Sequence, residues 1–303
     1  MRNVIIAVLL ACLLPLPAAA RQWEPFVWSS GEVGGKTHEK VAVLVPIQIE
    51  GVARKLYAQL DTGADVTIFY GYKLRGYGVP FDSTEVSSLS FRWYGSQDES
   101  GPVVNPFIFT WSMGGEIDTT STAPGDNIVG TIGLDQVIDK ILVLDFPHQR
   151  FAVLDDTAAV AALIPTDVAY IDAEIAYNKF YLRLPFGDDT IPAVRYDCGA
   201  SIATLILPLD YWEWATGLAI DSPQVAVDSV PSWGKYVTTY TAPSQFSMIF
   251  GQVHIERPDM MYIEWPDPSL ANEKLLGNAP FYDDYVVVVD CIRSKFGVAR
   301  SVR

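Results

Sequence analysis

The chain has 303 residues, half of them hydrophobic, and a formal net charge of −15. This length suits one large domain or two lobes of about 120–140 residues each. A surface this acidic is a poor partner for nucleic acid, so we expect no nucleic-acid-binding function. The acidity fits a soluble exported protein. The alternative is adaptation to acid, because many carboxylates lose charge together as the pH falls.

The first 20 residues have the pattern of a signal peptide. Arg2 supplies a positive charge, an apolar stretch runs from Val4 to Leu16, and Ala18-Ala19-Ala20 offers a small-residue cleavage site. The apolar stretch is short for a membrane span. A lipoprotein signal at Cys12 is the alternative, although the residues after Cys12 stay apolar. We expect residues 1–20 to be removed and the mature chain to be exported, secreted or periplasmic, without an integral membrane segment.

Strand patterns begin after residues 21–37, which we expect to form an irregular leader. Val41 to Ile49 alternates and is rich in valine and isoleucine, and Leu56 to Leu60 runs into an aspartate. There the chain reads Asp61-Thr62-Gly63-Ala64-Asp65. An aspartate, a small residue, a glycine and another small residue, between a β-like run and an apolar run, indicate a carboxylate at the tip of a tight turn. The 20 prolines and 22 glycines also favour many turns and an all-β fold.

The second half of the chain repeats this order. Phe180 to Pro185 is a predicted strand, Gly187-Asp188-Asp189 a turn, and Ile191 to Tyr196 a second strand. That strand leads into Asp197-Cys198-Gly199-Ala200-Ser201. The two aspartates are 136 residues apart (197 − 61), which indicates an internal duplication.

The repeat continues beyond the two turns. An apolar pair and a glycine come next in each half, Ile128 to Leu134 in the first and Leu275 to Asn278 in the second. Each is followed by a strand between two aspartates six residues apart, at 139–145 and 284–290. We therefore predict an N-terminal lobe at 38–160 and a C-terminal lobe at 161–303. Residues 157–167 would connect the lobes, and 210–218 would form a short helix.

Two aspartates in matching settings predict two carboxyl groups that face each other. Such a pair cannot easily ionise twice, so one member holds a proton while the other is charged. The pair can activate a water without a metal or a covalent intermediate. His38, His148 and His254 lack metal-ligand spacing, so no metal or cofactor is expected. Residues 199–203 are faintly similar to a serine-nucleophile turn, but no α/β alternation surrounds them.

The duplicated turns, each followed by an apolar-apolar-glycine strand, resemble the pepsin-like aspartic proteases, and the first copy has a retropepsin-like motif. The resemblance covers about residues 40–300. It implies a bilobal, pseudo-twofold all-β fold with a few short helices. It also implies that Asp61 and Asp197 hold the attacking water and that Gly63 and Gly199 let the turns approach each other.

The resemblance assigns supporting roles around the aspartates. Thr62 would reach across the junction to the other turn, whereas Cys198 departs from the family's threonine and would be a weaker donor and acceptor. Ala64, Ala200 and Ser201 complete the turns. Of the two cysteines left after signal removal, Cys198 and Cys291, we expect buried free thiols; a disulfide is the alternative.

Two further sites are implied for substrate. Asp65 would contact the substrate backbone as in retropepsins; the alternative is a solvated or structurally paired carboxylate. Tyr94 and Gly95 would lie at the tip of a hairpin flap over the cleft; the alternative is an ordinary surface hairpin. Residues 21–37 are also short for the inhibitory pro-segment that many of these enzymes carry.

The sequence therefore predicts an exported aspartic endopeptidase that acts on extended polypeptides as a monomer. The competing hypothesis is a binding or inhibitor protein that kept the fold and lost catalysis, as plant enzyme inhibitors did. Loss of either aspartate would favour the binder. Both aspartates are present, which favours the enzyme.

Overall fold

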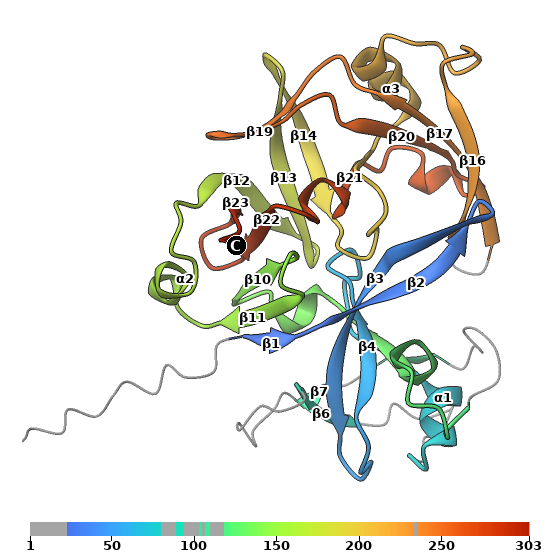
Figure 1. Ribbon diagram of the computed structural model, residues 1–303, viewed down its shortest axis with the longest axis vertical. Coiled ribbons are helices and arrows are strands. Elements are labelled where there is room, and N and C mark those ends of the chain that lie inside the picture. Colours follow the sequence, from blue (N-terminus) through green and yellow to red (C-terminus); the bar gives the residue numbers. More distant parts are fainter. Residues whose placement is uncertain are drawn as a thin grey trace, which may run out of the picture.

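The computed structural model describes residues 23–79, 89–93, 103–104, 107–109, 118–232 and 235–302. Within these ranges the chain is built mostly from β-strands, with three short α-helices (Figure 1), which confirms the all-β prediction. The predicted signal peptide at 1–20 and the predicted flap tip at Tyr94 and Gly95 lie outside the described residues.

Short strands dominate both halves, and η denotes a 3₁₀ turn. The first half comprises β1 (Glu24–Pro25), β2 (Val27–Val33), β3 (Lys36–Ile49), β4 (Leu56–Leu60), β5 (Ile68–Tyr70), α1 (Gly71–Gly76), β6 (Leu89–Trp93), β7 (Val103–Val104), β8 (Phe107–Phe109), η1 (Pro124–Asn127), β9 (Ile128–Ile132), η2 (Leu134–Gln136), β10 (Ile141–Asp145), β11 (Arg150–Leu154) and α2 (Thr157–Leu163). The second half comprises β12 (Ala169–Ala176), β13 (Lys179–Phe186), β14 (Asp189–Tyr196), β15 (Leu205–Ile206), α3 (Leu209–Thr216), β16 (Ala226–Ser232), β17 (Lys235–Pro243), β18 (Met248–Phe250), β19 (Val253–Ile255), β20 (Asp259–Glu264), η3 (Pro268–Leu270), β21 (Leu275–Leu276), η4 (Ala279–Phe281), β22 (Tyr285–Asp290) and β23 (Lys295–Arg300).

The strand pairing confirms the internal duplication. In the first half β3 and β4 are antiparallel, β4 runs parallel to β9, and β5 pairs antiparallel with β9 and parallel with β8. In the second half β13 and β14 are antiparallel, β14 runs parallel to β21, and β15 pairs antiparallel with β21 and parallel with β20. The two halves thus repeat one topology, with an aspartate turn after β4 and after β14.

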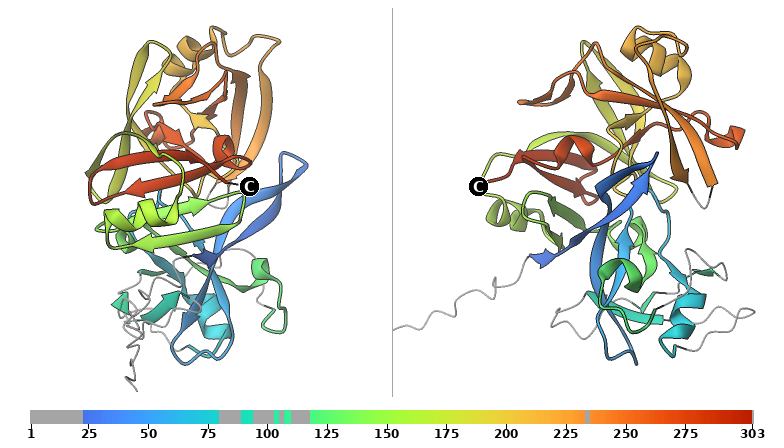
Figure 2. Two further views of the ribbon diagram at one scale, coloured as in Figure 1. Left: turned by 60° about the vertical axis from the view of Figure 1, so that its left-hand side comes forward. Right: turned by 45° about the vertical axis from the view of Figure 1, so that its right-hand side comes forward.

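A six-stranded antiparallel portion joins the halves, in the order β1-β11-β10-β22-β23-β12. Its centre is the pairing of β10 with β22, where Val143 lies opposite Val288. Figure 2 shows the green strands β10 and β11 and the red strands β22 and β23 between the blue–cyan and the yellow–orange parts of the chain. The run from Val286 to Val289 is buried along its whole length, as expected for strands covered on both faces.

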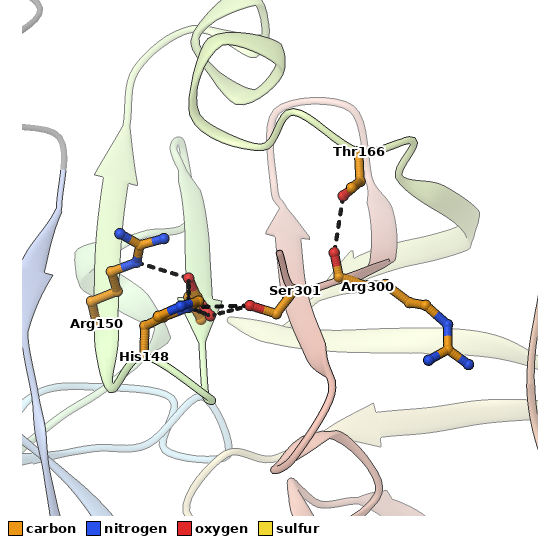
Figure 3. A network of polar contacts seen from close by, with 6 residues as sticks. His148, Arg150, Thr166, Arg300 and Ser301 are labelled. Atoms are coloured by element: carbon orange, nitrogen blue, oxygen red, sulfur yellow. Dashed lines mark hydrogen bonds and ion pairs between the residues drawn. The ribbon is translucent and has the colours of Figure 1, made fainter. Parts of the chain in front are cut away.

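Both central strands end on a buried aspartate. Asp145 accepts hydrogen bonds from Arg150 Nε (2.8 Å), Ser301 Oγ (3.0 Å) and His148 Nδ1 (2.9 Å). Figure 3 shows His148, Arg150 and Ser301 converging, with Thr166 bonded to the Arg300 carbonyl beside them. Such partners offset the cost of burying a charge.

The network around Asp145 is structural. His148 contacts both the carboxylate and Ser301 Oγ (3.2 Å) through the same ring nitrogen, Nδ1. A Ser–His–Asp relay needs both ring nitrogens, so these three side chains do not form one. The matching Asp290 accepts from the backbone N–H and the Nε of Arg293, at 2.9 and 2.6 Å.

The prediction of an irregular leader at 21–37 was wrong. Residues 24–25 form β1 beside β11, and residues 27–33 form β2, which pairs with β3. The buried Phe26, 2% exposed, anchors the segment between them. The pairing shifts register between Ser29 and Gly31, and this irregularity broke the alternation that marks a strand in a sequence.

The helical predictions fared better. The predicted helix at 210–218 corresponds to α3, and the predicted connector at 157–167 contains α2. Asp156 caps α2 by accepting a hydrogen bond from the Ala158 N–H (2.8 Å).

Candidate active site

Each predicted catalytic aspartate follows a strand that is locked beside the apolar-apolar-glycine strand of its own half. Asp61 follows β4, and its N–H donates to the Ile132 carbonyl in β9 (3.0 Å). Asp197 follows β14, and its N–H donates to the Leu276 carbonyl in β21 (2.9 Å). The second sequence signature therefore lies directly against the first in both halves.

The two turns hold their carboxylates in the same way. Asp61 Oδ1 accepts from the backbone N–H groups of Gly63 (2.9 Å) and Ala64 (3.2 Å). Asp197 Oδ1 accepts from those of Gly199 (2.9 Å) and Ala200 (3.1 Å). In each aspartate the backbone holds the carboxylate oxygen Oδ1, so the turn also fixes where the second oxygen, Oδ2, points.

The glycines bring the two carboxyl groups together. A Cβ on Gly63 would lie 2.5 Å from both carboxyl oxygens of Asp197. A Cβ on Gly199 would lie 2.5 Å from Oδ1 of Asp61. Each turn thus contacts the carboxylate of the other half, and only a residue without a side chain leaves the space.

Thr62 and Cys198 tie the turns to each other beneath the aspartates. Thr62 Oγ1 donates to the Tyr196 carbonyl (3.1 Å) and accepts from the Cys198 N–H (3.0 Å). Cys198 Sγ donates to the Leu60 carbonyl (3.3 Å) and accepts from the Thr62 N–H (3.2 Å). The sulfur therefore makes every contact of the reciprocal set. Burial raises the pKa of the Cys198 thiol, so it stays protonated and able to donate.

The electrostatics of the site fit two carboxyl groups that share a proton. Asp61 is partly buried, and desolvation by this burial is the largest cause that raises its pKa well above the usual value. Repulsion from Asp197 and a side-chain hydrogen bond with it raise that pKa further, while the N–H groups of Gly63 and Ala64 lower it. One of the pair can therefore hold a proton where an isolated aspartate would be ionised.

Asn278 supports the second turn, a role that the sequence reading missed. Its Nδ2 donates to the Cys198 carbonyl (2.9 Å) and to Ser201 Oγ (3.0 Å), and its Oδ1 accepts from the Tyr196 hydroxyl (2.8 Å). The signal was present: Asn278 is polar where the first copy has Leu134 after the glycine. Ser201 is itself buried and donates to the Cys198 carbonyl (3.0 Å), so it belongs to the turn and is not an exposed nucleophile.

Charged groups of the second half approach the first turn. Lys179 Nζ lies 3.8 Å from Asp65 Oδ2, and Arg195 Nη1 donates to the Gly63 carbonyl (3.4 Å) while its Nη2 pairs with Glu273 (3.3 Å). The Asp65 side chain is 45% exposed, so it is paired and still accessible. Sequence reasoning did not anticipate these roles of Lys179 and Arg195, because neither residue lies within a recognisable motif.

The predicted flap residues Tyr94 and Gly95 follow β6, which lies within the described part of the chain. β6 ends at Trp93 and pairs antiparallel with β7, Leu89 opposite Val104. β6 also pairs with β3, and the Trp93 ring lies 5.2 Å from the ring of Phe151.

Other observations bear on the chemistry. Cys198 and Cys291 are free and buried, which confirms that prediction. Within the part of the chain that the structure describes, no group of three or more His, Cys, Asp or Glu side chains could hold a metal, and no helix is long and apolar enough to cross a membrane. A scan against protein-family models finds no match, and a search of curated proteins finds no relative.

Proposed function

We propose that the protein is an exported aspartic endopeptidase. The observation that carries the proposal is the reciprocal approach of the two turns, in which Gly63 contacts the Asp197 carboxyl group and Gly199 that of Asp61. Two carboxyl groups so placed, with a raised pKa at Asp61, have the arrangement that activates a water between them.

The proposed reaction follows from two carboxyl groups that share one proton. The ionised carboxylate takes a proton from the bound water, and the water oxygen attacks the scissile carbonyl carbon. The protonated carboxyl group donates to the carbonyl oxygen and stabilises the charge that develops there. Protonation of the amide nitrogen then lets the carbon–nitrogen bond break, which gives a carboxylic acid and an amine. One chain supplies both aspartates, so the enzyme acts as a monomer.

The substrates are extended polypeptides. Such chains bind by adding a strand to an exposed edge, with backbone hydrogen bonds for affinity and side-chain pockets for specificity. In this proposal Asp65, whose side chain is 45% exposed, accepts a hydrogen bond from a substrate backbone N–H.

Cys198 is the observation that favours a fold-retaining binding protein instead. It replaces the threonine expected at the lobe junction with a weaker hydrogen-bonding group. Because its sulfur keeps both contacts of the junction, we favour the enzyme.

The proposal is tested by digesting a denatured protein and a peptide library across a pH series, with and without pepstatin. We expect cleavage inside the chain that pepstatin abolishes. Binding of peptides without any new termini at every pH would identify the binding protein instead.

The alanines that follow the two aspartates predict where the acidic limb of the pH–rate profile lies. Ala64 and Ala200 stand where a serine or threonine would donate to the carboxylate, and a missing donor raises the pKa of the pair. A hydrogen bond to a charged group contributes roughly 1.5–3 kcal/mol, and about 1.4 kcal/mol equals one pKa unit. Backbone donors and water recover much of this, so we expect a small rise and a mildly acidic to near-neutral optimum.

Ala64→Ser and Ala200→Thr should therefore move the acidic limb of the pH–rate profile to lower pH. The added hydroxyl stabilises the anion, so the working ionised form persists in more acid solution. Ala219→Ser, at an exposed position after α3, is the control and should leave the profile in place. An optimum that is unmoved or raised in the first two variants would refute the hydrogen-bond argument.

The N-terminal strands predict that no further trimming is needed. β1 and β2 pair with β11 and β3, so residues 24–33 lie in the folded sheet, which argues against a removable pro-segment there. Recombinant protein that starts at Arg21 should be active at once and keep its mass. An obligatory mass loss before activity, followed by mass spectrometry during an acid incubation, would count against this.

A further inference from the structure

Tyr282 joins the second active-site turn to the first half of the chain. It follows η4, and its hydroxyl contacts the carbonyl oxygens of Ser201, in the second turn, and of Lys40, in β3 (3.1 Å for Lys40). Burial is the main cause that raises the pKa of Tyr282, so the phenol stays protonated. The phenol has a single proton, so it donates to one of these two carbonyl oxygens at a time.

The N-terminal strands hold the Tyr282 ring in place. The Trp28 ring, in β2, packs edge-on at 5.0 Å, and Phe146 lies at 6.1 Å. Trp28 and Phe146 stack on each other at 5.7 Å, so the two rings pack against Tyr282 as one aromatic cluster. The Lys40 ammonium lies 4.7 Å from the ring centre of Tyr282 and 3.1 Å from Asp283, which fixes the ring from its face.

The contact leads directly to the second aspartate. Ser201, whose carbonyl accepts from Tyr282, donates through its hydroxyl to the carbonyl of Cys198 (3.0 Å). Cys198 is the residue after Asp197. The matching position of the first turn is Asp65, which pairs through its side chain with Lys179 instead. The Tyr282 contact is therefore specific to the turn that carries Asp197.

We propose that Tyr282 is a positioning residue for Asp197, and that Trp28 in the N-terminal strand holds Tyr282 in that role. Tyr282 acts through Ser201 and does not touch the substrate. In this proposal the N-terminal strand β2 supports the active site through Trp28. This inference rests on the proposed function, because it assigns a role in the reaction of that site.

The test compares Tyr282→Phe with Tyr285→Phe. The first variant keeps the ring and its aromatic contacts and removes only the hydroxyl. Tyr285 lies three residues further on, with its ring on Phe281 and Arg300, and serves as the matched control. We expect kcat to fall about tenfold in Tyr282→Phe with KM within about twofold, since small displacements of a catalytic group act on the chemical step. Tyr285→Phe should behave as the wild type. Trp28→Leu should lower kcat, as Tyr282→Phe does.

A second readout does not depend on catalysis. Amide hydrogen exchange at residues 198–203 should be faster in Tyr282→Phe than in the wild type and Tyr285→Phe, while exchange in the first turn stays the same. Unchanged kcat together with unchanged exchange in Tyr282→Phe would overturn the proposal, as would a loss of thermal stability without any change in kcat. If the wild type shows no hydrolysis, the proposed function fails, and the exchange comparison alone decides whether Tyr282 positions the turn.

Discussion

Replacing Asp197 with asparagine should lower kcat/KM by about a thousandfold or more, since general acid–base catalysis contributes about 10²–10⁴-fold and the pair acts as a unit. Asparagine has nearly the shape of aspartate, and its oxygen can still accept from the N–H groups of Gly199 and Ala200. It cannot take a proton from water. The fold should therefore persist while the reaction stops.

The same reasoning predicts how stability depends on pH. The folded protein holds the Asp61 proton more tightly than the unfolded chain does, because burial and Asp197 raise the pKa of Asp61. The free energy of unfolding should thus fall as the pH rises from the ordinary aspartate pKa through the raised one. Asp61→Asn removes this group, so its thermal stability should equal or exceed that of the wild type near neutral pH.

These variants need a control that alters an aspartate without touching the pair. Asp189 lies at the exposed start of β14, the strand that ends before Asp197. Asp189→Asn should keep both kcat/KM and Tm. Steady-state kinetics and thermal unfolding should be measured for all three variants and the wild type. An Asp197→Asn variant with near wild-type turnover would refute the two-carboxylate mechanism.

Adding a methyl group to either turn glycine should also inactivate the protein. The Cβ of Gly63→Ala would lie 2.5 Å from the carboxyl oxygens of Asp197, far inside contact distance. The group that must move is the Asp197 carboxylate, which the proposed mechanism places at the reacting centre. Displacements of about 1 Å cost about 10²-fold in rate, and the crowding costs about 1–3 kcal/mol of stability. Gly199→Ala should do the same through Asp61.

Gly125 provides the matched control, because a Cβ there would meet nothing within 4 Å. Gly125→Ala should leave kcat/KM unchanged, whereas Gly63→Ala should lower it by about 10²-fold or more. Full activity in Gly63→Ala would mean that the two turns are further apart in the working protein, and the reciprocal packing of the dyad would then be abandoned.

The parts of the fold that sequence could predict are those with a local signature. The strand from Val41 to Ile49 alternates, and both aspartate turns carry small residues at fixed positions, so these features were located correctly. The duplication was readable because it repeats such signatures in the same order. β2 was missed because an irregular register at Gly31 interrupts the alternation.

The missed site residues share a different cause. Arg195 and Tyr282 act through partners far away in the chain, and no local pattern reports such contacts. Asn278 also has distant partners, and its only signal was its difference from Leu134 at the matching place of the first copy. Cys198 shows the converse: its chemistry suggested a weakened junction, yet the sulfur sits where it can make both contacts. Residue type alone does not give that placement.

The most direct test of the central claim is digestion of a denatured protein in water enriched in ¹⁸O, followed by mass spectrometry of the products. We predict that new peptide termini outnumber enzyme molecules, that each new carboxyl end carries one oxygen from water, and that no covalent adduct forms on the enzyme. The double variant Asp61→Asn/Asp197→Asn should produce no new peptide termini. Cleavage that persists in the double variant, or peptide binding by the wild type without any new termini, would contradict the account.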